Sequence, residues 1–214
     1  MKIYLRDVFS GGSIDTNKWV VAPTVTIENG EAVITKTTEP GSVAVAGNLT
    51  SKVVVPSSVV IHFDSRFITN IVHQSGTGFW TTENMFFRKT DSDWNTGQCM
   101  QAFITYHADS DVLIEAFLYL YHRTAGVSPA LVGKASLPLD LFESLDIEGS
   151  GVVIRDLNIK AQGGKFTVRV ADVEVDVFID PSPLQVASSV QFGTAQAVNL
   201  TLKNSIDNIL VTSV

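Results

Sequence analysis

Apolar and polar residues alternate along most of this chain, with the period of two that is typical of half-buried β-strands. The clearest example runs from Leu157 to Ile179, where turns at Gly163-Gly164 and Ala171-Asp172 separate three alternating runs. This pattern predicts three consecutive antiparallel strands with one face in water. No long stretch keeps a helical period, and one short helix is expected near Leu139 to Leu145.

Two earlier segments extend the strand pattern. Val59 to Phe67 alternates between apolar residues and a polar face, whereas Val112 to Tyr121 is apolar on both sides, which predicts a central strand covered on both faces. Glycine and proline breaks between such segments suit about a dozen strands in two packed sheets. We therefore expect an all-β fold, built as a two-sheet antiparallel sandwich and forming one domain over residues 1–214.

Composition narrows the classes of partner. The chain has 214 residues, 45% of them hydrophobic and 17% charged, with a formal net charge of -7. Without basic segments it lacks the cations that neutralise phosphates, so no nucleic-acid partner is expected. It has no apolar run of membrane-spanning or signal-peptide length, so we expect synthesis in the cytoplasm without membrane insertion. The single cysteine, Cys99, excludes an intrachain disulfide and is expected to be a buried apolar residue.

Three segments carry a family resemblance: Asp7 to Trp19, Leu157 to Phe178, and Ser205 to Val211. The first resembles the F-x-G-x-L-D-x-x-x-W opening, the second the laminin-G-like hairpin, and the third the closing I-D-N-V-x-V strand of the concanavalin A-like lectin and glucanase superfamily. The resemblance implies a jelly-roll sandwich whose first and last strands share a sheet. It implies little about function, because this fold hosts lectins, hydrolases, lyases, adhesion modules and virion proteins.

Two surfaces are candidates for ligand binding. The first is the long segment 73–98, expected to be a loop at the rim of the sandwich, in which Trp80 and Trp94 could stack on sugar faces. The second is a face that would combine aromatic platforms with hydrogen-bonding groups, as a carbohydrate groove requires. Its members are His62, Asp64, Arg66, Glu115, Tyr119 and Tyr121. The alternative for this face is an internal ion network of Asp64 and Arg66, and for Trp80 a place in the core.

Two patterns of candidate catalytic and metal-binding residues are incomplete. Retaining glycosidases need one carboxylate to attack and another to protonate, and laminarinase-type glucanases of the resembled fold place these groups at alternate positions of a strand. Asp146 and Glu148 have that spacing, but Glu143 has an odd offset and the segment adjoins a loop, so no catalytic residue is assigned. Asp91, Asp93 and Asn95 present oxygen atoms at alternate positions and could hold calcium, although the segment departs from the EF-hand pattern and also suits a simple turn. No other cofactor is expected.

These observations leave three functional hypotheses open. The first is a non-catalytic structural or recognition sandwich, such as a phage-type capsid decoration or tail-associated protein that is oligomeric and contacts protein partners or surface glycans. The second is a carbohydrate-active enzyme of the glucanase or polysaccharide lyase type, with Glu115, His62 and Tyr119 as its participants. The third is a stand-alone lectin-like module. The sequence favours the first, because export signals and an assembled active site are both missing from it.

Overall fold

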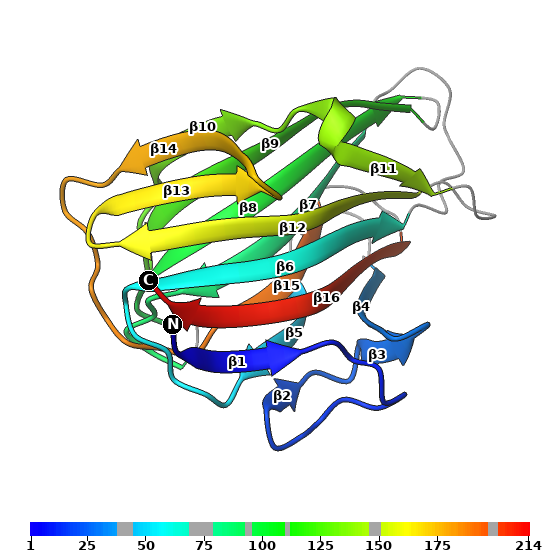
Figure 1. The fold of residues 1–214 in the computed structure, drawn as a ribbon, viewed down its shortest axis with the longest axis horizontal. Coiled ribbons are helices and arrows are strands. Elements are labelled where there is room, and N and C mark those ends of the chain that lie inside the picture. The colour runs from blue at the N-terminus through cyan, green and yellow to red at the C-terminus, as the bar shows by residue number, and fades with distance from the viewer. Residues whose placement is uncertain (38–44, 69–78, 93–95, 110–111, 146–150, 197–200) are drawn as a thin grey trace.

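The computed structural model describes residues 1–37, 45–68, 79–92, 96–109, 112–145, 151–196 and 201–214. These residues form two antiparallel sheets that pack face to face (Figure 1). The nine-stranded sheet contains β1 (Ile3–Asp7), β3 (Val25–Glu28), β4 (Glu31–Thr37), β6 (Val59–Ile68), β11 (Phe142–Leu145), β12 (Gly151–Gln162), β13 (Lys165–Val170), β14 (Val173–Ile179) and β16 (Thr201–Ser213). The seven-stranded sheet contains β2 (Trp19–Val21), β5 (Val45–Ser51), β7 (Phe79–Phe87), β8 (Gln98–Asp109), β9 (Val112–Thr124), β10 (Ala130–Ser136) and β15 (Gln191–Gln196).

The strand order confirms the predicted all-β jelly-roll sandwich. The nine-stranded sheet runs β14-β13-β12-β6-β16-β4-β3, with β1 paired to β16 and β11 to β12, and the seven-stranded sheet runs β10-β9-β8-β7-β15-β5-β2. The first and last strands share a sheet, as the family resemblance implies, and the termini lie close together (Figure 1). The three-strand meander β12-β13-β14 is also present, with Gly163 in the left-handed region at φ 58°.

The core lies between the sheets and is filled by alternate residues of the strands. Ile61 and Phe63 of β6 face Leu118 of β9 and Phe192 of β15 across it, and all four side chains are buried. The rings of Phe63 and Phe192 meet edge to face, with their centroids 5.3 Å apart. Because neighbouring residues of a strand point to opposite sides, the positions between these core residues form the outer faces of the two sheets.

The opening motif anchors the chain at one edge of the sandwich. Phe9 and Trp19 are almost completely buried, and their ring centroids lie 6.0 Å apart. The indole nitrogen of Trp19 donates a hydrogen bond of 2.8 Å to the carboxylate of Asp7. The carboxylate of Asp15 accepts a hydrogen bond from the backbone nitrogen of Asn17, which stabilises the turn before Trp19.

Two local predictions need correction. The expected helix is a single 3-10 turn, η1 (Leu139–Leu141), followed by β11. The expected rim loop 73–98 contains a whole strand, β7, because its Met85 and Phe87 alternate into the core. No helix among the described residues is long and apolar enough to cross a membrane.

Candidate functional site

The structure divides the predicted six-residue face between two sheets. His62, Asp64 and Arg66 belong to β6 and lie on the outer face of the nine-stranded sheet. The other three, Glu115, Tyr119 and Tyr121, belong to β9 and lie on the outer face of the seven-stranded sheet. The prediction of one shared surface is therefore wrong. Alternation shows which residues share a face of one strand, but it does not show to which sheet that strand belongs.

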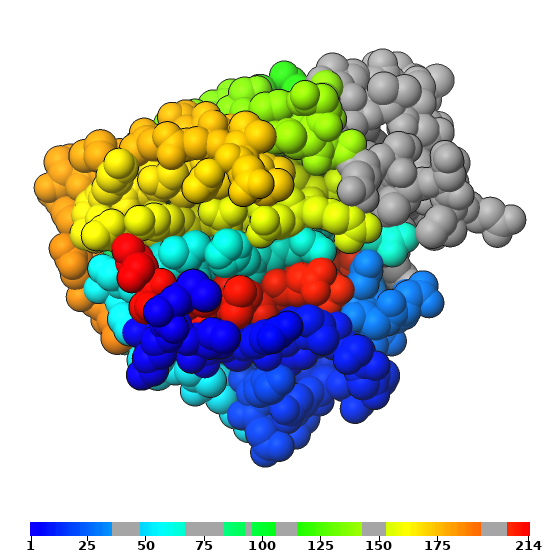
Figure 2. Space-filling view, in the orientation of Figure 1, coloured from blue at the N-terminus to red at the C-terminus, as the bar shows by residue number. Residues whose placement is uncertain are grey.

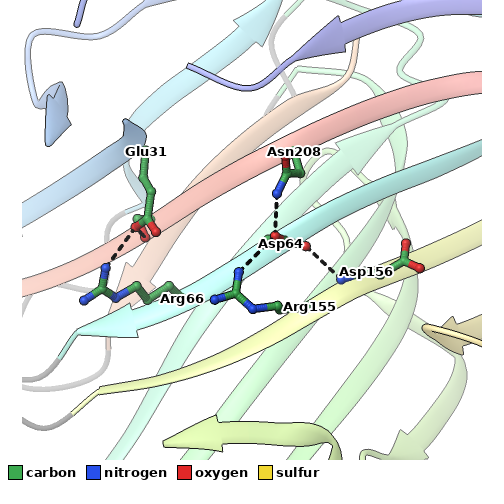
Figure 3. A network of polar contacts seen from close by, with 7 residues as sticks. Glu31, Asp64, Arg66, Arg155, Asp156 and Asn208 are labelled. Carbon is green, nitrogen blue, oxygen red and sulfur yellow. Dashed lines mark hydrogen bonds and ion pairs between the residues drawn. The ribbon is translucent and has the colours of Figure 1, made fainter. Parts of the chain in front are cut away.

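The β6 residues take part in a polar network on the face shown in Figure 2, where β1, β16, β6 and β12 lie side by side. Asp64 is at its centre (Figure 3). Its carboxylate accepts hydrogen bonds from the backbone nitrogen of Asp156 at 2.8 Å, from Nδ2 of Asn208 at 2.6 Å and from Arg155 at 3.4 Å. Arg66 pairs with Glu31 at 3.3 Å. The structure does not join Asp64 and Arg66 in the one internal ion network that was the alternative for this face: each is paired within the protein, but with a separate partner.

Asp64 has a structural reason to be where it is. Asp156 and Asn208 both adopt left-handed φ angles, 50° and 51°. Each sits at a register shift, one in the pairing of β12 with β6 and the other in the pairing of β16 with β6. Such β-bulges leave a residue outside the regular ladder. The Asp64 carboxylate stabilises both bulges from the strand between them, so its hydrogen-bonding capacity is used within the protein.

The outer face of the seven-stranded sheet carries an aromatic cluster of half-buried rings on β8 and β9. The cluster consists of Phe103, Phe117, Tyr119 and Tyr121. Tyr119 and Tyr121 are stacked at 6.0 Å with an interplanar angle of 15°, and Phe103 meets Tyr119 edge to face at 6.0 Å. Burial raises the pKa of Tyr121, with a smaller contribution from the neighbouring Tyr119, so the Tyr121 phenol stays neutral at pH 7.

Lys134 of β10 completes one side of the aromatic cluster. Its ammonium nitrogen lies 3.6 Å from the ring centroid of Phe117 and 5.3 Å from that of Tyr119. This is the geometry of a cation–π contact, in which the ring faces attract the charge. The side chain of Lys134 is exposed. The cluster therefore offers apolar ring surface and a positive charge side by side.

On the same face, a chain of hydrogen bonds runs from β9 through β8 to β7. Arg123 donates to Oε1 of Gln101 at 3.0 Å, and Nε2 of Gln101 donates to Oδ1 of Asn84. Because a guanidinium can only donate, it determines the orientation of the Gln101 amide, which in turn directs Oδ1 of Asn84, and not Nδ2, toward Gln101. Beside it, the ammonium of Lys89 donates to Oε1 of Gln191 at 3.0 Å. We call these five residues the amide relay.

Three polar atoms on this face have no hydrogen-bond partner. They are Nδ2 of Asn84, Oγ1 of Thr105 and Oδ1 of Asn48. Asn84 is fully buried and Thr105 is 6% exposed. Leaving a buried donor or acceptor unsatisfied costs about 1–3 kcal/mol, and most buried polar groups of folded proteins avoid this cost. Five further atoms of this kind lie elsewhere among the described residues, so unsatisfied atoms alone do not single out this face; their place beside the aromatic cluster does.

The strand register brings these groups into rows across the sheet. One row reads Lys134, Tyr119, Phe103, Asn84, Gly193 and Asn48, from β10 through β5. In a second row, Glu115 of β9 lies opposite His107 of β8, which lies opposite Trp80 of β7. The side chains of His107 and Trp80 lie outside the part that the structure describes, so the predicted stacking of Trp80 on a ligand stays a prediction.

The remaining candidates are placed only in part. Trp94, Asp93 and Asn95 lie outside the described residues, so the predicted calcium loop stays untested, and within the described residues no group of three potential ligands could hold a metal ion. Asp91 is exposed. Glu143 is the second residue of β11, whereas Asp146 and Glu148 lie outside the described residues. Cys99 is buried as predicted, on the outer side of β8, and burial raises the pKa of its thiol to about 11.

The sequence interpretation missed Asn84, Gln101, Thr105 and Lys134. A signal for β8 was present, because Met100, Ala102 and Ile104 alternate into the core and place the residues between them outward. Asn84 gave no such signal. Its neighbours Thr81 to Glu83 are polar on both sides of the strand, so alternation does not distinguish the two faces there.

Comparison with known proteins supports the fold without identifying a family. No protein-family model and no curated protein sequence matches the chain. Among solved structures, a Bacillus subtilis protein of unknown function with a galectin-like fold has a TM-score of 0.63 at 13% identity, covering 100% of this chain and 96% of its own. Bacillus licheniformis β-glucanase has a TM-score of 0.63 at 11% identity, covering 98% of each chain. A carbohydrate-binding module from Bacillus subtilis has a TM-score of 0.51 at 15% identity, covering 92% of this chain and 96% of its own. The chain thus shares its fold with galectin-like, β-glucanase and carbohydrate-binding structures.

The same comparison corrects the favoured functional hypothesis. Most of the similar structures reported are glycan-cleaving enzymes, among them a β-glucanase, a lichenase and a native glycosidic hydrolase. The expectation of a non-catalytic phage-type capsid or tail protein is therefore wrong. That expectation depended on the absence of an export signal and of a complete carboxylate pattern, and neither absence distinguishes a virion protein from an enzyme.

Proposed function

We propose that this protein binds and cleaves a glycan polymer on the outer face of its seven-stranded sheet. The observation that carries the proposal is the aromatic cluster of Phe103, Phe117, Tyr119 and Tyr121 next to unsatisfied buried polar atoms. Sugars have apolar ring faces, which stack on aromatic side chains, and hydroxyl groups, which need donors and acceptors. The fold supports the same reading, since β-glucanases and glycosidic hydrolases share it.

Glu115 is our candidate for the acid–base group. It lies on β9 next to the aromatic cluster, two residues from Phe117 on the same face, and it is half-buried. A carboxyl group in such a position can donate a proton to a leaving oxygen or remove one from a sugar carbon. His107, opposite Glu115 in the ladder, is the candidate second group. His62, which the sequence suggested for this role, lies on the other sheet and is excluded from it.

The proposal is tested by incubating the protein with neutral glucans and with uronate-containing polymers. Released reducing ends and new unsaturated products are measured for the wild type, Glu115→Gln and His107→Ala. We expect turnover by the wild type and its loss in both variants, because Glu115 and His107 are the two proposed proton-transfer groups. Glu174→Gln is the matched control, since Glu174 is an exposed residue of β14 in the opposite sheet.

The outcomes separate cleavage from binding. If the wild type binds a glycan but never releases products, catalysis is wrong and the face only recognises its ligand. If no glycan of either class is bound or cleaved, the whole proposal fails. Turnover that survives in Glu115→Gln would show that a different group carries the chemistry.

A further inference from the structure

Asn29 and Gly30 form the two-residue turn that joins β3 to β4. The two strands pair antiparallel up to Glu28 and Glu31, and both turn residues have positive φ angles, 53° and 83°. This is the backbone of the mirror-image turns that close tight hairpins, for which asparagine followed by glycine is a preferred pair. The chain contains this pair only once. The turn geometry therefore explains why a chemically reactive pair of residues stands here.

An asparagine that precedes glycine can react with its own backbone. The backbone nitrogen of Gly30 loses its proton and attacks Cγ of Asn29, so that a new C–N bond forms and the side-chain nitrogen leaves as ammonia. The product is a five-membered succinimide ring. Water then opens the ring at either carbonyl, which gives aspartate or isoaspartate, whose main chain passes through the former side chain. Glycine favours the attack because it has no Cβ to hinder its nitrogen.

The described surroundings of the turn leave this reaction open. Asn29 is exposed, and its side-chain amide forms no hydrogen bond with a described residue. A Cβ built on Gly30 would meet no atom within 4 Å, so there is free space beside the attacking nitrogen. Ring closure requires the Asn29 backbone to rotate out of the turn. The turn is the tip of a hairpin whose strand β3 ends the order of its sheet, and such segments open locally at low free energy.

Asn208 provides a contrast within the same protein. It is also exposed and has a positive φ angle, 51°. Its Nδ2, however, donates a hydrogen bond of 2.6 Å to Asp64, and the next residue, Ile209, is β-branched and fully buried. A side chain that must first break a hydrogen bond to a charged group should react at least about tenfold more slowly than one that is free.

From these observations we propose that Asn29 is a site of spontaneous deamidation, at which the folded protein converts this residue to aspartate and isoaspartate without an enzyme. Each event makes the formal net charge of -7 one unit more negative. The new carboxylate lies between Glu28 and Glu31, which already face each other as a like-charged pair. Isoaspartate also lengthens the main chain of the turn by one carbon atom. Because turn length determines the register of a hairpin, β3 then loses its pairing with β4.

The test follows the purified full-length protein during several weeks at pH 8 in water enriched in heavy oxygen. Mass spectrometry of peptides measures the exchange of amide for carboxylate at Asn29 and at Asn208, and uptake of heavy oxygen shows that a ring was opened by water. Fragmentation of the peptides distinguishes isoaspartate from aspartate. Amide hydrogen exchange of β3 and β4 reports on the hairpin. Freshly prepared Asn29→Asp is the matched control, because it carries the new charge on a main chain of normal length.

We expect Asn29 to convert at least about tenfold faster than Asn208, with isoaspartate among its products. Aged wild-type protein should lose the slow hydrogen exchange of β3, whereas fresh Asn29→Asp should keep it, because aspartate tolerates the left-handed conformation of the turn.

Three results would contradict the proposal. If Asn29 stays unchanged in the native protein but converts in the urea-unfolded chain, the folded turn protects it and the site does not exist in the native state. If Asn208 converts as fast as Asn29, the surroundings of the two residues do not control the reaction. If aged protein that contains isoaspartate exchanges its β3 amides as slowly as before, the proposed effect on the hairpin is wrong.

Discussion

Asp64 is expected to stabilise the protein without contributing to its function. Asp64→Ala removes the acceptor for Asp156, Asn208 and Arg155 at once. The Asp156 and Asn208 contacts are short, and the Asp64 side chain is only 12% exposed. Each is a hydrogen bond to a charged group, which contributes about 1.5–3 kcal/mol. The Arg155 side chain is 54% exposed, so its ion pair is screened by water and adds at most about 0.5 kcal/mol.

Taking the lower end of each range, because both donors border solvent, Asp64→Ala should lower the free energy of unfolding by about 3 kcal/mol. For a protein of this size, 1 kcal/mol shifts Tm by about 2–4 °C, so Tm should fall by roughly 6–12 °C. Urea unfolding followed by fluorescence gives the first value and calorimetry the second. Asp64→Asn, which keeps one acceptor oxygen, should lose about half as much.

His62→Ala is the matched control for this prediction. His62 lies on the same strand and face, but its partner Asp156 is 54% exposed, so this variant should cost less than about 1 kcal/mol. A loss below 1 kcal/mol in Asp64→Ala would refute the role of Asp64 at the two bulges. A fully stable Asp64→Ala that no longer binds glycans would instead place the ligand on the nine-stranded sheet.

Three further predictions concern single sites. Burial raises the pKa of Asp207, so protonated Asp207 stabilises the folded state below the ordinary carboxyl pKa, and this contribution is lost as pH rises through the raised value. In urea titrations, Asp207→Asn should therefore be more stable than the wild type at pH 7 but not at pH 3. Because burial raises the pKa of Cys99 to about 11, iodoacetamide should label its thiol at pH 8 only in denaturant, and rapid labelling of the native protein would contradict the buried position. A Cβ on Gly133 would lie 2.2 Å from the ring of Phe178, so Gly133→Ala should lower the free energy of unfolding by about 1–3 kcal/mol. Adding Phe178→Leu should recover part of that stability, whereas strictly additive effects in the double variant would show that the two sites are not in contact.

The sequence predicts well those parts of the fold that depend on neighbouring residues. The meander from β12 to β14 and the outward position of Asp64 on β6 both follow from alternation and local turns, and the structure confirms them. The pairing of β1 with β16 was accessible only through the family resemblance, since a strand's pattern does not identify its partner.

The candidate site was harder to predict because it depends on distant residues. Asn84 and Gln101 can be buried because they are hydrogen-bonded to each other and Gln101 is also bonded to Arg123 of β9. Hydropathy gives no indication of such burial. Grouping Asp64 with Glu115 failed for a related reason. The two positions look alike within their own strands, and only the long-range assembly of each sheet places them on opposite sides of the molecule.

The position of β16 has a consequence for how the protein is made. This strand comes last in the chain, yet it lies inside its sheet between β6 and β4 (Figure 1). During synthesis, β4 and β6 leave the ribosome long before the segment that joins them, and until then each presents an open edge to other chains. The nine-stranded sheet can therefore close only after β16 has been made, and a premature stop before Thr201 would leave two unpaired edges that invite aggregation.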